Sequence, residues 1–126
     1  MKKIVIVIMI VFVFLMSSCT LFKSKEATES GIVTISVVDI NNQIVKEKEI
    51  SFNEGDTLVS LVQNNFDNVV MDGTMIMSIE TLTTPANWST FICIKVNGED
   101  SMVGIMDIVL KDGDHISFVD TVNMYA

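Results

Sequence analysis

The sequence contains no arginine, and it has only one histidine, one proline and one tryptophan among its 126 residues. The shortage of basic side chains gives a formal charge of −8 at pH 7, which argues against a nucleic acid partner because phosphates bind to basic surfaces. A nucleophile needs a base and an orienting group, and the single His115 lies next to a turn. We therefore predict that the protein is not an enzyme, and we assign no catalytic residue.

Metal-ligand patterns are also scarce. A zinc site needs three or four converging ligands, and His115 has no cysteine near it in the sequence. Asp112, Gly113 and Asp114 lack the regularly spaced oxygen ligands of a calcium loop. We interpret these three residues as a turn, and we predict neither a metal site nor a bound cofactor.

The longest apolar run lies at the N-terminus. Lys2 and Lys3 precede an uninterrupted apolar stretch at residues 4–16, and small serine residues follow it. This order is typical of a secretory signal peptide, to which we assign residues 1–18. The stretch is short for a bilayer, which needs about 20 residues. A plain transmembrane anchor is the alternative interpretation.

The only two cysteines are Cys19 and Cys93. The segment Met16-Ser17-Ser18-Cys19 resembles the bacterial lipobox, in which the cysteine is diacylated and the signal peptide is cut just before it. We therefore predict lipid attachment at Cys19, with acyl chains such as palmitate, and a location on the extracytoplasmic face of the bacterial cell membrane. An ordinary cysteine at a secretory cleavage site is the alternative.

Cleavage before Cys19 would leave a more acidic chain with one cysteine. Loss of the two N-terminal lysines takes the formal charge from −8 to −10. Cys93 then has no partner for a disulfide, and its apolar surroundings predict a small core residue and not a reactive thiol. Residues 19–30 are polar after the lipid site and predict a flexible tether. Residues 31–126 are expected to form one domain.

Short β-rich segments and turns follow the tether. Apolar residues at every second position predict strands, and a spacing of three or four predicts one helix after an N-cap at Asp56. The nearly continuous apolar run at residues 90–96 predicts a central strand. Met75 and Met77 share a strand face, which we expect to pack on the helix. The predicted elements are strands at residues 32–39, 44–52, 75–79, 90–96 and 115–119, a turn at Asn41-Asn42, an extended or turn segment at residues 105–110, and a helix with Leu58, Leu61, Val62 and Phe66 on its apolar face.

A hairpin, one helix and then further strands form the element order of an α+β fold. We predict a β-grasp-like domain, in which a mixed β-sheet has one short amphipathic helix packed on one face. The Asp-Gly-Asp turn before a last β-rich strand, within residues 110–118, is frequent in such domains.

Several of these signals occur in an order that resembles the transcobalamin-like C-terminal domain. This is a bacterial domain family of unassigned function, similar to the small C-terminal domain of the vitamin B12 carriers. The resemblance covers roughly residues 31–120. The motifs are EGDTLVSLV, GTMIMSI, Trp88 after a loop, Val96-Asn97-Gly98-Glu99, Gly104-Ile105 and Leu110-Lys111-Asp112-Gly113-Asp114.

The resemblance implies a candidate ligand and candidate ligand-binding residues. In the vitamin carriers, the stretch around the matching tryptophan contacts the corrinoid, which implies Trp88, Ser89 and Thr90 as ligand-binding residues here. The aromatic residue that usually precedes this tryptophan is Asn87 in this sequence. The carriers hold the corrinoid between this domain and a large helical domain that this sequence lacks. The resemblance therefore implies half of a corrinoid site.

The sequence is compatible with two functions. The first is capture of a corrinoid or another small ligand for an uptake system, with a transporter as partner. It predicts a partly exposed Trp88 beside a concave apolar surface. The second is a protein-interaction or structural module of the cell envelope without a small ligand. It predicts a flat face or an open sheet edge, such as the charged segment at residues 46–49, that accepts a strand from a partner.

Overall fold

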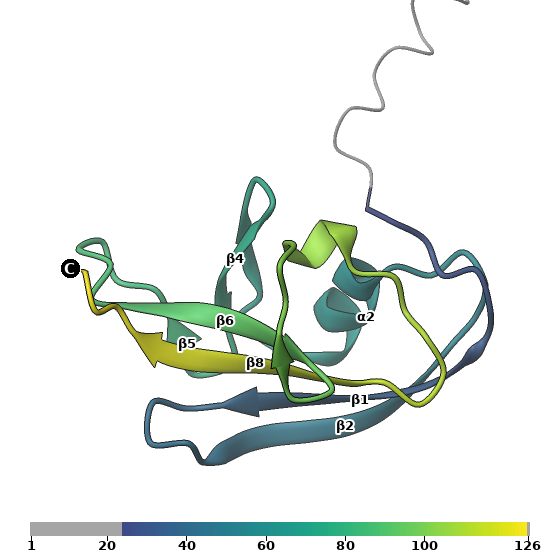
Figure 1. Cartoon of the computed structure of the whole chain (residues 1–126), viewed down its shortest axis with the longest axis horizontal. Helices are drawn as coiled ribbons and strands as arrows, with labels where there is room; N and C mark the ends of the chain where they lie inside the picture. The colour runs from purple at the N-terminus through teal and green to yellow at the C-terminus, as the bar shows by residue number, and fades with distance from the viewer. Residues whose placement is uncertain (1–23, 126) are drawn as a thin grey trace, which may run out of the picture.

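The computed structural model describes residues 24–125 (Figure 1). The predicted signal peptide at residues 1–18 and the predicted lipid attachment at Cys19 lie outside the described residues. Within residues 24–125, no helix is long and apolar enough to cross a membrane.

The main element is a five-stranded sheet with the order β2-β1-β8-β6-β7. An antiparallel hairpin joins β1 (Gly31–Val38) to β2 (Ile44–Phe52). The last strand, β8 (His115–Val122), inserts parallel to β1, and β6 (Thr90–Val96) pairs antiparallel with β8. The short β7 (Glu99–Asp100) follows at the edge. A first hairpin with the last strand parallel beside it is the β-grasp arrangement, so the predicted fold class is confirmed.

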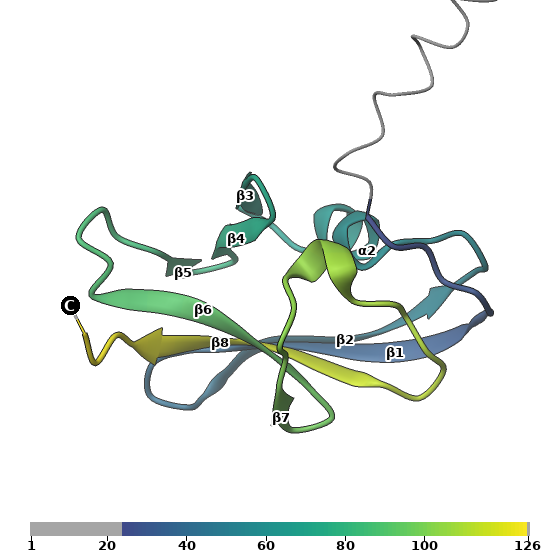
Figure 2. The ribbon, with the colours of Figure 1, turned by 45° about the horizontal axis from the view of Figure 1, so that its top comes forward.

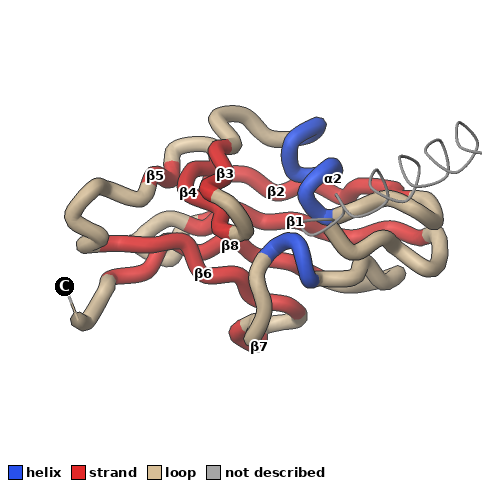
Figure 3. Tube along the Cα trace, turned by 90° about the horizontal axis from the view of Figure 1, so that it is seen from above, coloured by secondary structure: helices blue, strands red, loops and turns tan. Residues whose placement is uncertain are grey.

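All other described elements lie on one face of this sheet (Figure 2). They are α2 (Leu58–Asn65), the 3-10 helix η1 (Ile105–Asp107) and a small antiparallel sheet. Seen from above, α2 and η1 lie side by side, and the small sheet continues the layer toward the end where β8 finishes (Figure 3). The small sheet consists of β3 (Val70–Asp72), β4 (Met75–Ile79) and β5 (Leu82–Thr83).

The core lies between this layer and the large sheet. Every second residue of a strand points to the same face, and Val33, Ile35 and Val37 of β1 are all 0% exposed. Ile116 and Phe118 of β8 are buried beside them. Among the described residues, the buried apolar cluster lies between residues 27 and 118, so a domain of residues 24–126 retains all of this cluster.

The helix α2 begins one residue later than the sequence predicts. Thr57 is the N-cap: its hydroxyl accepts a hydrogen bond from the Ser60 N–H at 3.1 Å, and the Ser60 hydroxyl accepts one from the Thr57 N–H at 3.3 Å. Asp56, the predicted N-cap, instead accepts a hydrogen bond from the Asn53 N–H at 2.9 Å and closes the preceding turn. The reciprocal pair satisfies two groups of the helix start, which explains why threonine is the cap.

Three further expectations about side-chain placement are wrong. β6 lies near the edge of the sheet and not at its centre, because only Lys95 and Val96 pair with β7 on its outer side. The buried face of β4 presents Ile76 and Ser78, while Met75 is 49% exposed, so the methionine face is not the packed one. Cys93 is half-buried and lies outside the core cluster. For the methionines and Cys93, an apolar run was compatible with either face of the strand, and the register decided between them.

Candidate functional site

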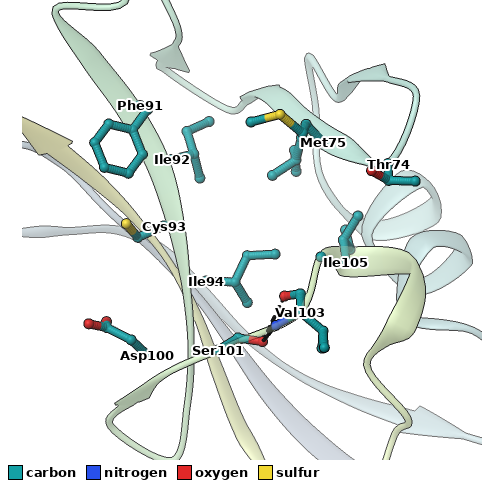
Figure 4. Close-up of a pocket in the computed structure, with 12 residues that line it drawn as sticks. Thr74, Met75, Phe91, Ile92, Cys93, Ile94, Asp100, Ser101, Val103 and Ile105 are labelled. Atoms are coloured by element: carbon teal, nitrogen blue, oxygen red, sulfur yellow. Dashed lines mark hydrogen bonds between the residues drawn. The ribbon is translucent and has the colours of Figure 1, made fainter. Parts of the chain in front are cut away.

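An apolar cavity of about 320 Å³ lies beside β6, on the same side of the large sheet as the helix and the small sheet (Figure 4). Ile92 and Ile94 point into it from β6, Met75 faces them from β4, and Ile105 approaches from η1 (Figure 4). Most of the lining is therefore aliphatic. The cavity is lined by Thr74, Met75, Ile76, Phe91, Ile92, Cys93, Ile94, Asp100, Ser101, Val103, Gly104 and Ile105.

The cavity lies along an unpaired strand edge. β6 pairs with β8 over its full length, but with β7 only at Lys95 and Val96. The Ser101 N–H donates a hydrogen bond to the Ile94 carbonyl at 2.8 Å, which places the outward peptide groups of Ile94 on this side. In an antiparallel strand, the backbone groups of alternate residues point to the same edge. Ile92 therefore presents its N–H and C=O to the cavity side, where no described strand pairs with them.

The segment at residues 101–104 forms a further wall of the cavity, through Ser101, Val103 and Gly104. Ser101 stabilises it, because its hydroxyl donates a hydrogen bond to the Val103 carbonyl at 2.8 Å and accepts one from the Val103 N–H at 3.2 Å. Gly104 lies against the β3–β4 turn, where an added Cβ would stand 3.0 Å from the Thr74 carbonyl oxygen. The close approach of these two backbones favours glycine at this position and holds the wall of the cavity together.

The predicted ligand residues Trp88, Ser89 and Thr90 lie directly before the cavity-lining part of β6. Trp88 is 38% exposed and adopts a left-handed backbone conformation with φ 56°. Asn123 holds the segment to the end of β8, since its side-chain amide donates to the Trp88 carbonyl and its N–H to the Ser89 carbonyl, both at 2.9 Å. Trp88, Ser89 and Thr90 do not line the cavity.

Asp120 is a residue of this region that the sequence analysis missed. It is the pairing partner of Ile92 and lies on the face of β8 that also presents Phe118. Desolvation by burial, reinforced by the negative charge of Asp39, raises the pKa of the Asp120 carboxyl, and hydrogen bonds from the Thr121 backbone and the Thr90 side chain oppose this. Its Oδ1 atom is buried without a hydrogen-bond partner. In the sequence, Asp120 stands two positions after Phe118, and residues two apart in a strand point to the same face. This spacing was the signal for an acid on the buried face.

A family profile described as "Domain of unknown function (DUF4430)" matches residues 55–119, which is more than half of the sequence. The chain belongs to this family. The matched range begins just before α2 and includes all residues that line the cavity. No curated protein matches the sequence.

Two solved structures support the fold of this DUF4430 domain. A protein from Ruminococcus gnavus, described as a "putative metal binding protein", is 18% identical, with a TM-score of 0.56 over 74% of this chain and 98% of that protein. Haptocorrin in complex with Cbi is 16% identical, with a TM-score of 0.61 over 77% of this chain and 26% of haptocorrin. This chain therefore corresponds to about a quarter of haptocorrin, and it shares the transcobalamin-like fold.

The single histidine takes part in a hydrogen-bonded cluster on the other face of the sheet. The Ser36 hydroxyl lies 2.7 Å from His115 Nε2 and donates a hydrogen bond to the Glu47 carboxylate, also at 2.7 Å. Ser36 is only 1% exposed, which prevents a substrate from reaching its hydroxyl. Within residues 24–125, no group of three or more His, Cys, Asp or Glu side chains could hold a metal ion.

Proposed function

We propose that this chain is a membrane-anchored, extracytoplasmic lipoprotein whose DUF4430 domain binds a small ligand without catalysis, and that a corrinoid taken up by the cell is the first candidate. The observation that supports this most strongly is the aliphatic cavity beside the unpaired edge of β6. Small-molecule sites are concave and mostly apolar, with a few polar groups that orient the ligand.

The composition of the cavity suits an amphipathic ligand. Ile92, Ile94 and Ile105 supply apolar contact, and the free peptide groups of β6 supply hydrogen-bond donors and acceptors beside them. Its volume of about 320 Å³ is at the lower end of the range for ligand sites, about 300–1,000 Å³. A ligand as large as a corrinoid would place only one side in it, which agrees with half of a shared site.

Trp88 and Asp120 would extend this site toward the end of β8. The half-exposed indole offers an apolar surface with one N–H donor. The carboxyl of Asp120 has one oxygen without a partner, and it is joined to Thr90 by a hydrogen bond.

The proposal for membrane attachment rests on residues 1–19. A basic start, an apolar run and the Met16-Ser17-Ser18-Cys19 segment are the features of a lipoprotein signal. Expression of the full chain in bacteria with labelled palmitate tests it. Label should appear in the wild-type chain in the membrane fraction and should be absent from Cys19→Ser. Equal labelling of Cys93→Ser and wild type is the matched control, and label that survives in Cys19→Ser would contradict the proposal.

The ligand proposal is tested on the soluble domain at residues 24–126. Cobalamin and cobinamide are titrated by calorimetry, and the emission of Trp88, the only tryptophan, is followed in parallel. Saturable binding that Trp88→Ala weakens about tenfold or more would support the site. Ile32→Ala, a half-exposed residue at the start of β1, is the control and should bind like wild type. Absence of binding up to millimolar ligand would refute a corrinoid site on the isolated domain.

The alternative is a protein-interaction or structural module of the cell envelope. The exposed outer edge of β2 favours it, since strand addition needs an edge without a partner. In that case corrinoids would leave the calorimetric trace flat, and an envelope protein would protect the amides of β2 from hydrogen exchange.

A further inference from the structure

The large sheet has one covered face and one open face. The helix α2, the 3-10 helix η1 and the small sheet all lie on the first face (Figure 2). On β6, Figure 4 shows Phe91 and Cys93 on the opposite side from the cavity-facing Ile92 and Ile94. No described helix or strand lies over this second side, which we call the open face (Figure 2).

The strand registers arrange the open face in cross-strand rows. Each row runs from β6 through β8 and β1 to β2, because residues that pair directly across strands point to the same face. Lys95 pairs with Ser117, Ser117 with Ser36, and Ser36 with Glu47. An apolar row and a polar row lie on either side of this row, each two residues away along the strands. In the same order, the apolar row is Cys93, Val119, Val38 and Ile44, and the polar row is His115, Thr34 and Glu49, with Asn97 next to His115.

The two ends of these rows carry opposite charges. Lys95 stands at the β6 end, where it is 42% exposed and only 3.9 Å from Asp100, its neighbour on β7. Glu47 and Glu49 stand at the β2 end and are exposed. In the apolar row, Ile44 is 61% exposed.

We propose that the open face is the interface for a second copy of this chain, related by a two-fold axis that runs parallel to the strands between β1 and β8. Such an axis places β2 of one copy over β6 of the other, and β1 over β8. Twofold-related interfaces are self-complementary, so each contact occurs twice. Two sheets packed face to face keep their strands roughly aligned, within about 30°.

The rows match under this axis. Glu47 meets Lys95 of the second copy, Ile44 meets Cys93, and Val38 meets Val119. Glu49 meets Asn97, and Thr34 meets His115. The axis therefore pairs opposite charges at Glu47 and Lys95, apolar side chains in the apolar row, and hydrogen-bonding side chains in the polar row. An axis across the strands would place β2 over β2 and Glu47 near its own copy, where repulsion opposes association.

Association would also bury what the monomer leaves in water. Val38, Val119, Cys93 and Phe91 are half-buried in the single chain, and Ile44 is mostly exposed. Removing apolar surface from water is the main favourable term in association. Because Ser36 already donates to Glu47, the polar middle of the face enters the interface with its hydrogen bonds made. The side chains of Ile92 and Ile94 point into the cavity on the covered face, whereas Phe91 and Cys93, which also line it, belong to the open face.

Charge reversal tests this arrangement. Residues 24–126 are measured by sedimentation equilibrium, and we expect a reversible dimer in the wild type. Lys95→Glu and Glu47→Lys should each raise the dimer dissociation constant about a hundredfold, because each variant places like charges opposite one another twice. Mixing the two variants should restore association as a heterodimer, because both contacts of that pair are again between opposite charges.

Matched controls separate this effect from net charge and from misfolding. Lys111→Glu and Glu54→Lys change the charge by the same amounts at exposed loop positions and should dimerise like wild type. Recovery in the mixture shows that each variant is folded. A wild-type domain that stays monomeric at millimolar concentration, or single variants that dimerise as well as the wild type, would overturn the proposal.

A crosslink reports the orientation. Ile44→Cys should give a covalent dimer with a short bis-maleimide reagent, through Cys93 of the second copy. Ile44→Cys combined with Cys93→Ser should not, because the two introduced thiols lie on opposite sides of the axis. Equal crosslinking of both variants would contradict the two-fold axis along the strands.

Discussion

The two edges of the large sheet are built differently. At the β2 edge, Lys46 and Lys48 point toward the covered face: Lys46 forms an ion pair with Glu80 at 3.1 Å, and Lys48 donates to the Asn65 carbonyl at 2.7 Å. Both ammonium groups lie within 6 Å of the Phe66 ring centre, at 5.9 and 5.7 Å. Inward-pointing charges protect an edge strand from unwanted pairing. On β6, Ile94 and Val96 lie in the same cross-strand rows as Lys46 and Lys48, and Ile94 lines the cavity.

At the β2 edge, inward-pointing lysines protect the strand from pairing, whereas the outer edge of β6 is left available to a ligand. Lys48 also stabilises the end of α2, because it donates a hydrogen bond to the Asn65 carbonyl in the last turn of the helix, where a positive charge is favourable. The predicted edge position of residues 46–49 is confirmed, but the side chains of Lys46 and Lys48 are half-buried. Strand addition at β2 is therefore harder than the sequence implies, whereas β6 offers apolar contacts and free peptide groups together.

The largest difference in stability is expected between alanine substitutions of inward-pointing isoleucines at the two edges. Ile50→Ala on β2 removes a buried side chain and should lower the free energy of unfolding by about 3 kcal/mol. Ile92→Ala on β6 should cost about 1 kcal/mol, because Ile92 is half-buried and faces the cavity. Urea unfolding of residues 24–126 measures both. Equal losses would show that Ile92 is an ordinary core residue and that the β6 edge is not open.

A smaller effect should come from the β2 edge itself. Lys48→Met keeps the apolar stem but removes the hydrogen bond to the Asn65 carbonyl, so we expect a loss of about 1 kcal/mol. Lys111→Met, in an exposed turn, should change stability by less than about 0.5 kcal/mol. If Lys48→Met unfolds at the same urea concentration as Lys111→Met, the inward lysine does not stabilise the β2 edge.

The pH dependence of stability should differ between the two edges in sign. A hydrogen bond from the Asp67 backbone, opposed by burial and aided by Lys46, lowers the pKa of Glu80 at the β2 edge below 4.5. Its stabilising contribution is therefore present above about pH 4.5 and is lost as the pH falls through the lowered value. Glu80→Gln should be less stable than wild type at neutral pH, by less than about 1 kcal/mol, and the difference should vanish in acid.

Asp120, beside β6, should behave in the opposite way. Burial raises its pKa above 3.8, so the folded state favours the protonated form. That contribution is present below about pH 3.8 and is lost as the pH rises through the raised value. Asp120→Asn should therefore be as stable as wild type in acid and slightly more stable at neutral pH. Thermal unfolding between pH 3 and pH 7 measures both variants. A wild-type advantage over Asp120→Asn at neutral pH would contradict this, because it would mean that the hydrogen bonds from Thr90 and Thr121 outweigh the cost of burying the charge.

Much of the fold follows from local patterns. Alternating residues in β1 and β8, the turn at Asn42 with φ 62° and the spacing within α2 predicted the hairpin, the last strand and the helix closely. The position of β6 within the sheet could not be predicted from these local patterns. A continuous apolar strand is expected at the centre of a sheet. Here one side of β6 faces the core and the cavity, and the other side contributes Cys93 to the open face, which produces the same apolar run near an edge.

The candidate site depended on contacts that no local pattern contains. Its walls come from residues 74–76, 91–94 and 100–105, which meet only through the path of the chain over the sheet. The sequence analysis reached Trp88 through a resemblance, and the structure places it just before the cavity-lining part of β6. Asp120 could have been found from its spacing to Phe118, because an acid on the buried face of a strand needs a partner.

The most direct test of the open β6 edge is an amide chemical-shift titration of ¹⁵N-labelled residues 24–126 with cobinamide. The account predicts saturable shifts at Thr90, Ile92 and Ile94 and at residues 101–105, with the amides of β2 unchanged. Shifts confined to β2, or no shifts at millimolar ligand, would contradict the claim that the cavity beside β6 is the ligand-binding edge of this domain.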